Sequence, residues 1–201
     1  MSSSSQPFRE GKHMQSTSLP IKDLVVFAAL GAIMFVSHLV LMGVPNIGFI
    51  GLFISAFTLT YRARALIPIY IYIMLYGVFF GVLTWIPYLF VWLPLWGMFM
   101  LIGRFNLPVK VKVPVYMFLC ALHGLSFGTL YAPFSALLFG IPFSFQTILA
   151  WIVAGFPYDI AHAIGNLAAG LLIVPLSELL KRLDAQVKLN SKSTKLSDVD
   201  V

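Results

Sequence analysis

Long uncharged stretches alternate with short charged clusters along this chain. No charged residue lies between Asp23 and Arg62, and a second uncharged stretch ends at Arg104. About 20 apolar residues cross the bilayer core as one helix, so each stretch is long enough for two crossings. Turn-forming residues divide the two stretches at Met42–Asn46 and Thr84–Pro87. The pattern predicts six transmembrane helices, over residues 21–41, 47–60, 65–83, 88–103, 113–130 and 157–176.

The last apolar region is too long for one crossing. A continuous helix over Phe145–Leu176 would extend about 50 Å at 1.5 Å per residue, against a hydrocarbon core of about 30 Å. The sequence Gly155-Phe156-Pro157 predicts a break, because Pro157 suits the first turn of a new helix. We therefore expect residues 131–154 to form an outer cap or a re-entrant element.

Composition agrees with a membrane protein. Hydrophobic residues make up 60% of the 201 residues and charged residues 10%, against about 25% charged in a typical soluble domain. The predicted fold class is an all-α membrane protein of six transmembrane helices. Residues 1–20 are expected to be a flexible cytoplasmic tail, 21–180 the six-helix substrate-binding domain, and 181–201 a polar cytoplasmic tail.

The basic residues predict which side of the membrane each end faces. They lie before or within the first turn of the first predicted helix and follow the second, fourth and sixth, whereas the connections after the first, third and fifth carry no Lys or Arg. Cytoplasmic loops are enriched in Lys and Arg, so both termini and the loops 61–64 and 104–112 are predicted to be cytoplasmic. The net charge of +6 is explained by these flanking positions, and we expect no nucleic-acid partner. The residues concerned are Lys12, Lys22, Arg62, Arg64, Arg104, Lys110, Lys112, Lys181 and Arg182.

One acidic residue falls at membrane depth. Histidines aside, Asp159 is the only ionisable acid or base between Lys112 and Glu178. A charged group within the bilayer is costly and is a functional candidate by default. The alternative is a carboxylate that stabilises the positive N-terminus of the last predicted helix. His162 and Asn166 lie on the same helix face, so the three side chains form one polar stripe.

Other candidates gather at the predicted outer ends of the helices. His38 lies in the outer part of the first helix and His123 near the middle of the fifth, where each either binds a ligand or bonds a backbone carbonyl. Aromatic residues there form an interfacial belt or line an outward-facing ligand mouth. The predicted substrate-binding residues are His38, Asn46, Trp85, Tyr88, Asp159, His162 and Asn166.

Two stripes of small residues permit close helix contacts. Ala28 and Ala32, with Gly31 between them, lie in the cytoplasmic third of the first helix, within reach of a partner protein. The stripe of Ala161, Gly165 and Ala169 is expected to pack inside the bundle. The single cysteine, Cys120, allows no intrachain disulfide and is expected to be a buried small residue.

Motifs for nucleotide, zinc or acyl-transfer chemistry are absent. The sequence has no Gly-x-x-x-x-Gly-Lys-Ser/Thr loop, no His-Glu-x-x-His and no Gly-x-Ser-x-Gly. We expect no metal, no cofactor and no catalysis by this chain, so an ATP-driven task would need other subunits. A membrane enzyme using Asp159 and His162 as an acid–base pair, and a structural or assembly protein, stay open as alternatives.

Three segments carry a resemblance to a known family: Phe27–Ala32, Trp85–Tyr88 and Trp151–His162. Over residues 20–180 the chain resembles the substrate-binding S component of an energy-coupling factor (ECF) transporter, a vitamin importer of the bacterial plasma membrane. The resemblance implies that the chain captures a micronutrient near the outer face. It also implies docking, through Ala28, Gly31 and Ala32, on a transmembrane coupling subunit that two ATPase subunits serve.

The sequence restricts the identity of the substrate less than it restricts the fold. The predicted outer connections carry no Lys or Arg to meet a carboxylate, which disfavours ligands of the folate, biotin or pantothenate type. An uncharged aromatic mouth with a few polar groups favours a bulky amide-rich or weakly cationic ligand. Cobalamin is the first expectation, and a queuosine-type precursor is the second.

Overall fold

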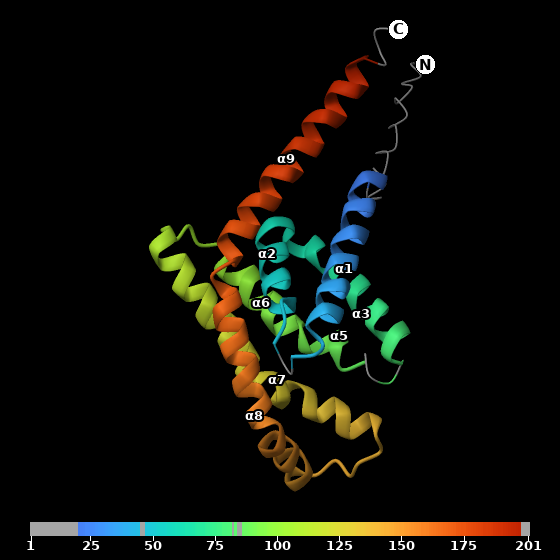
Figure 1. Cartoon of the computed structure of the whole chain (residues 1–201), viewed down its shortest axis with the longest axis vertical. Helices are drawn as coiled ribbons and strands as arrows, with labels where there is room; N and C mark the ends of the chain where they lie inside the picture. The colour runs from blue at the N-terminus through green and yellow to red at the C-terminus, as the bar shows by residue number, and fades with distance from the viewer. Residues whose placement is uncertain (1–19, 45–46, 82, 84–85, 198–201) are drawn as a thin grey trace, which may run out of the picture.

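The computed structural model describes residues 20–44, 47–81, 83 and 86–197. Every element in this part of the chain is a helix (Figure 1). The all-helical prediction is therefore confirmed. The elements are α1 (Ile21–Leu41), α2 (Ile50–Tyr61), the 3-10 turn η1 (Arg62–Ala65), α3 (Leu66–Phe80), α5 (Tyr88–Val91), α6 (Leu93–Ile102), α7 (Val109–Leu138), α8 (Phe145–Gly170) and α9 (Ile173–Ser197).

Most of the described helices before α9 have the length and composition of membrane spans. Four helical stretches are long and apolar enough to cross a bilayer: Ile21–Leu41, Ile50–Phe80, Val109–Leu138 and Phe145–Gly170. A shorter apolar stretch covers Tyr88–Ile102. Large apolar side chains are exposed on the outside, with Val78 83% and Val40 76% accessible. Such surfaces fit lipid rather than water, which agrees with a membrane protein.

The first half of the chain follows its predicted boundaries closely. Helix α1 covers residues 21–41, as the pattern predicts. At Arg62 the backbone takes φ 57° and ψ −125°, which interrupts the helical path between α2 and α3. Helix α2 is central, with eight of its 12 residues buried. The hydroxyl of Ser55 donates to the Gly51 carbonyl at 2.7 Å, and Cys120 is buried beside it, as expected.

The predicted boundaries in the second half are wrong. Helix α7 continues to Leu138, and α8 begins at Phe145 and passes through Pro157. The expected cap over 131–154 therefore consists of the end of α7, a short connection and the start of α8. Proline removes one helical hydrogen bond but is tolerated within membrane helices. The break comes instead at residues 171–172, inside the helix predicted over 157–176.

Helices α7 and α8 form an antiparallel pair held close by glycines. A Cβ added at Gly124 would lie 2.9 Å from the Ala163 Cα, and one added at Gly170 would lie 2.7 Å from the Met117 Cα. Real Cβ contacts of this kind need at least about 3 Å of clearance, so side chains other than hydrogen would push the helices apart. Small residues thus set the separation of the pair.

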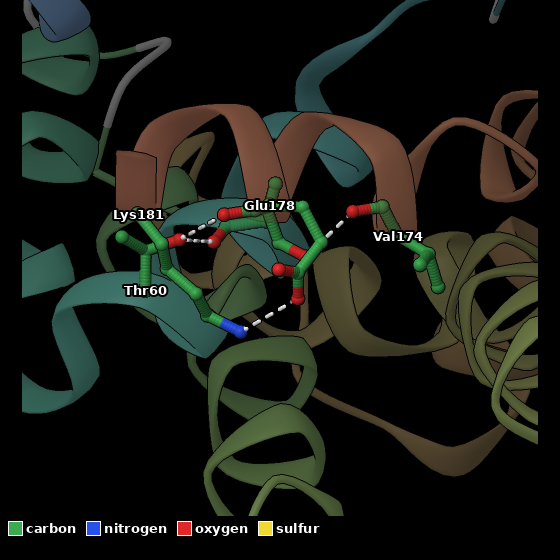
Figure 2. Close-up of polar contacts among 6 residues, drawn as sticks. Thr60, Val174, Glu178 and Lys181 are labelled. Atoms are coloured by element: carbon green, nitrogen blue, oxygen red, sulfur yellow. Dashed lines mark hydrogen bonds and ion pairs between the residues drawn. The ribbon is translucent and has the colours of Figure 1, made fainter. Parts of the chain in front are cut away.

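Helix α9 packs against the end of α2 (Figure 2). The Thr60 hydroxyl on α2 donates to the carbonyl of Ser177 at 3.4 Å, and the Ser177 hydroxyl donates to the Val174 carbonyl at 2.9 Å. Along the same helix Lys181 pairs with Glu178 at 3.1 Å.

Charged residues distant in sequence gather at this end of the bundle. Arg64 pairs with Asp23 of α1 at 3.2 Å. Arg62 donates to the Met100 carbonyl near the end of α6 at 2.7 Å. A surface hollow at the same end is lined by Arg104, Lys112 and Lys181, among others. Figure 1 shows the start of α1 and the length of α9 at this end, with the α7–α8 connection at the other.

Candidate functional site

A small cavity lies at the end of the bundle opposite the charged cluster. Its volume is about 150 Å³. The C-terminal part of α1, the segment leading into α2, the start of α2, and helices α3, α5, α7 and α8 contribute to it, together with Trp92 between α5 and α6. None of the described lining residues is Lys, Arg, Asp or Glu. They are His38, Leu41, Met42, Val44, Ile47, Gly48, Ile50, Tyr72, Tyr88, Trp92, Phe127 and His162.

Aromatic rings build one wall of the cavity. The Phe127 ring centroid lies 4.8 Å from that of His162, 5.3 Å from that of Trp92 and 6.2 Å from that of Tyr88. The rings are tilted against each other, the arrangement that aromatic quadrupoles favour. Side chains from α5, α7 and α8 meet here although they are far apart in sequence.

His38 and Tyr72 form a second, more polar part of the cavity lining. His38 Nδ1 lies 3.4 Å from the Tyr72 hydroxyl, and the His38 ring meets the edge of Tyr76 at a centroid distance of 5.2 Å. Tyr72 is fully buried. The prediction that His38 belongs to the site is consistent with its position on the cavity wall, and its bonding partner is a side chain rather than a backbone carbonyl.

Several polar atoms near the aromatic wall are buried without a hydrogen-bond partner. They include Trp92 Nε1, His162 Nδ1 and His123 Nδ1. His123 stacks on Trp92 at a centroid distance of 5.3 Å, and its Nε2 donates to the Val91 carbonyl at 2.8 Å. The predicted alternative for His123, a bond to a backbone carbonyl, is therefore confirmed.

The three residues of the predicted polar stripe on α8 lie in two different surroundings. His162 lines the cavity, whereas Asp159 and Asn166 do not. Asp159 is 5% exposed and accepts a hydrogen bond from the backbone N–H of Gly128 at 2.9 Å. Asn166 is 1% exposed and lies beside Gly51 and Gly124. Both are therefore buried where α8 meets its neighbouring helices.

Two expectations for Asp159 change as a result. It lies in the middle of α8, since this helix begins at Phe145, so the reading as a partner of the helix N-terminus is wrong. Within the described part of the chain, no hydrogen bond joins Asp159 to His162. The carboxylate instead links α8 to α7.

The remaining predicted binding residues are Asn46, Trp85 and Tyr88, and the cavity also has lining residues that were not predicted. Asn46 and Trp85 lie outside the described residues. Tyr88, another predicted binding residue, lines the cavity. Tyr72, Trp92 and Phe127 line it too and were not among the predicted binding residues. The sequence marks these three residues only as aromatic, and 15% of the residues in the chain are aromatic.

The predicted docking residues lie on two faces of α1. Gly31 is buried, and a Cβ there would lie 2.6 Å from the Ile71 Cγ2 and 3.0 Å from the Pro68 carbonyl of α3. Its small size therefore serves packing within this chain. Ala28 and Ala32 are exposed and free to meet a partner. In the second stripe Ala169 is buried and Gly165 contacts Ile47, in keeping with the expected internal packing.

No family model, curated protein or solved structure matches this chain. Among the described residues, no group of three or more His, Cys, Asp or Glu side chains is arranged to hold a metal ion. The chemistry available in the cavity is that of aromatic rings, two imidazoles and tyrosine hydroxyls. These groups bind planar molecules by stacking and by neutral hydrogen bonds.

Proposed function

We propose that this chain is the substrate-binding S component of an ECF-type importer in a bacterial plasma membrane. One observation carries the proposal: an aromatic cavity at the end of an apolar helical bundle, opposite the end where the charged residues gather. The chain captures a micronutrient there and delivers it through a transmembrane coupling subunit. Two partner ATPase subunits supply the energy, because this chain has no phosphate-binding loop.

The proposal includes six membrane crossings with both termini in the cytoplasm. In this arrangement α1, α2, α3, the joined α5–α6, α7 and α8 each cross once. The clustering of Arg62, Arg64, Arg104, Lys112 and Lys181 at one end supports it, since basic residues favour the cytoplasmic face. Helix α9 then projects from the cytoplasmic end, and the cavity opens toward the outside.

Binding is favoured over catalysis by the surroundings of Asp159. A general acid or base must reach the substrate, within about 3 Å or through one water. Asp159 is absent from the cavity wall and bonds the Gly128 backbone. The alternative of an Asp–His acid–base pair therefore gains no support from this geometry. A purely structural role gives no reason for an uncharged aromatic cavity.

Cavity size bears on the substrate. Sites for drug-sized ligands usually enclose about 300–1,000 Å³, and a cavity of about 150 Å³ in another protein holds one benzene ring. The cavity here, about 150 Å³, is therefore suited to a ligand of one or two small rings. Cobalamin is far larger, so of our two expected substrates we propose a compound of queuosine-precursor size.

Mass spectrometry of the purified protein tests the proposal. We expect the detergent-solubilised chain to carry a small molecule in stoichiometric, chemically unaltered form. Phe127→Ala opens the aromatic wall and should lose the molecule. Phe118→Ala is the matched control, because Phe118 lies on the same helix but is 61% exposed. Equal retention by both variants, or conversion of the molecule by the chain alone, would contradict the proposal.

A further inference from the structure

The cavity wall has unused hydrogen-bonding capacity. Trp92 is 4% exposed, its ring lines the cavity, and its Nε1 donor has no partner. An indole N–H donates only, and leaving such a donor buried and unpaired destabilises the protein. Bulk water does not accept a hydrogen bond from this N–H, because the atom is shielded from solvent. An unpaired donor in a ligand cavity calls for an acceptor on the ligand.

His123, whose ring stacks on Trp92 behind the cavity wall, carries an unpaired acceptor. The Val91 carbonyl accepts only, so His123 Nε2 must carry the proton that bonds it at 2.8 Å. His123 is 1% exposed, and a doubly protonated ring would bury an uncompensated charge, which is far costlier. His123 Nδ1 is then a bare acceptor without a partner, on a ring stacked against Trp92. His162 adds a third unpaired ring nitrogen, Nδ1, on the wall itself.

The other residues of the cavity wall restrict the charge and the shape of the ligand. Its described residues include no Lys, Arg, Asp or Glu to pair with an ionised ligand. An ion placed there would lose its hydration without compensation. Tyr88, Trp92 and Phe127 present ring surfaces that match a flat molecule, and the volume of about 150 Å³ favours a compact one.

We infer that the cavity selects an uncharged nitrogen heterocycle with a lactam edge, meaning a ring N–H beside a ring C=O. The ligand carbonyl accepts from Trp92 Nε1, and the ligand N–H donates to the unpaired ring nitrogen of His162 on the cavity wall. The heterocycle stacks within the aromatic wall. This inference rests on the proposed function and specifies its substrate class.

Probe binding tests this class directly, by titration calorimetry on the intact solubilised chain. Uracil carries the lactam edge, orotate is uracil with a carboxylate, and 1,3-dimethyluracil keeps both carbonyls but has no N–H. We expect uracil to bind, and orotate and 1,3-dimethyluracil to bind about ten-fold or more weakly, since each loses a buried hydrogen bond or adds an unpaired charge. Orotate or dimethyluracil binding as tightly as uracil would overturn the inference.

Paired tryptophan variants locate the donor. Trp92→Phe keeps an aromatic ring and removes the N–H, so uracil affinity should fall about five- to a hundred-fold. Trp96→Phe is the control, because Trp96 Nε1 donates to the Arg62 carbonyl at the charged end. Equal affinity in both variants would also overturn the inference, and the wild-type comparison of probes keeps the test valid if Trp92→Phe misfolds.

The substrate class and the proposed function fail in distinguishable ways. If the chain binds none of the three probes but supports ATP-dependent uptake of a charged compound, the lactam inference is wrong and the transport function stands. If no small molecule binds and no uptake occurs, the proposed function itself is wrong.

Discussion

The carboxylate of Asp159 on α8 accepts a hydrogen bond from the backbone N–H of Gly128 on α7 at 2.9 Å. A Cβ at Gly128 would lie 2.5 Å from Asp159 Oδ2, so a side chain at this position would displace the Asp159 carboxylate. The acid therefore links the two helices through the backbone of the glycine. An acidic residue at membrane depth here has a packing role that can be tested apart from ligand binding.

Replacing Gly128 with alanine should destabilise the helix pair. The added methyl forces α7 and α8 apart or breaks the bond to Asp159, and overpacking of this kind costs about 1–3 kcal/mol. The melting temperature in detergent should fall. Gly155→Ala on α8 is the control, because a Cβ at that position meets nothing within 4 Å. If the two variants have the same melting temperature, the close contact at Gly128 is not structurally important.

Asp159 and His162 should respond differently to substitution. In Asp159→Asn an amide oxygen can still accept from Gly128, and the residue is absent from the cavity wall, so ligand affinity should change less than about three-fold. In His162→Ala the wall loses a ring packed 4.8 Å from Phe127, and affinity should fall about five- to a hundred-fold. Titration of the co-purified compound measures both. A larger loss in Asp159→Asn would place the carboxylate in the binding site after all.

Cysteine labelling tests the orientation. The natural cysteine, Cys120, is 1% exposed and gives a low background. Val44→Cys lies at the cavity end and Arg104→Cys at the charged end, and both positions are exposed. In intact cells a membrane-impermeant thiol reagent should label Val44→Cys and should reach Arg104→Cys only after lysis. Labelling of both from outside would contradict the six-crossing arrangement.

The sequence predicts the helices well where polar residues mark their ends. The charged residues Asp23 and Arg62 frame the first pair, and α1 has its predicted bounds. The prediction fails where an apolar run hides a break, because residues 171–172 carry no turn signal and Pro157 resembles a helix start while lying inside α8. Local patterns do not show that a membrane helix tolerates the proline.

The site could be predicted only in part, for a similar reason. His38, Tyr88 and His162, which line the cavity, could be named from the sequence because polar and interfacial residues are rare in apolar helices. Trp92 and Phe127 were missed because aromatic residues are common on every face of this chain, and only packing shows which of them meet. Asp159 and Asn166 share the face of His162, yet the neighbouring helices cover them, which no periodicity reveals.

Bulky residues on the exposed face of α1 should separate binding from transport. Ala28→Trp and Ala32→Trp obstruct close approach of a partner helix, whereas the cavity lies toward the other end of α1. Ligand affinity of the isolated chain should be unchanged and ATP-dependent uptake lost. Gly31→Ala is the contrasting variant, since its methyl meets Ile71 and should lower the stability of this chain itself. Normal uptake in both tryptophan variants would remove the docking role.

The central claim is that this chain is the ligand-binding part of an ATP-driven importer. The most direct measurement reconstitutes it in liposomes with a coupling subunit and two ATPase subunits, and follows accumulation of the compound that co-purifies with the chain. The account predicts accumulation that needs ATP and all four subunits and leaves the compound chemically unchanged. Accumulation without ATP, or conversion of the compound by this chain alone, would contradict it.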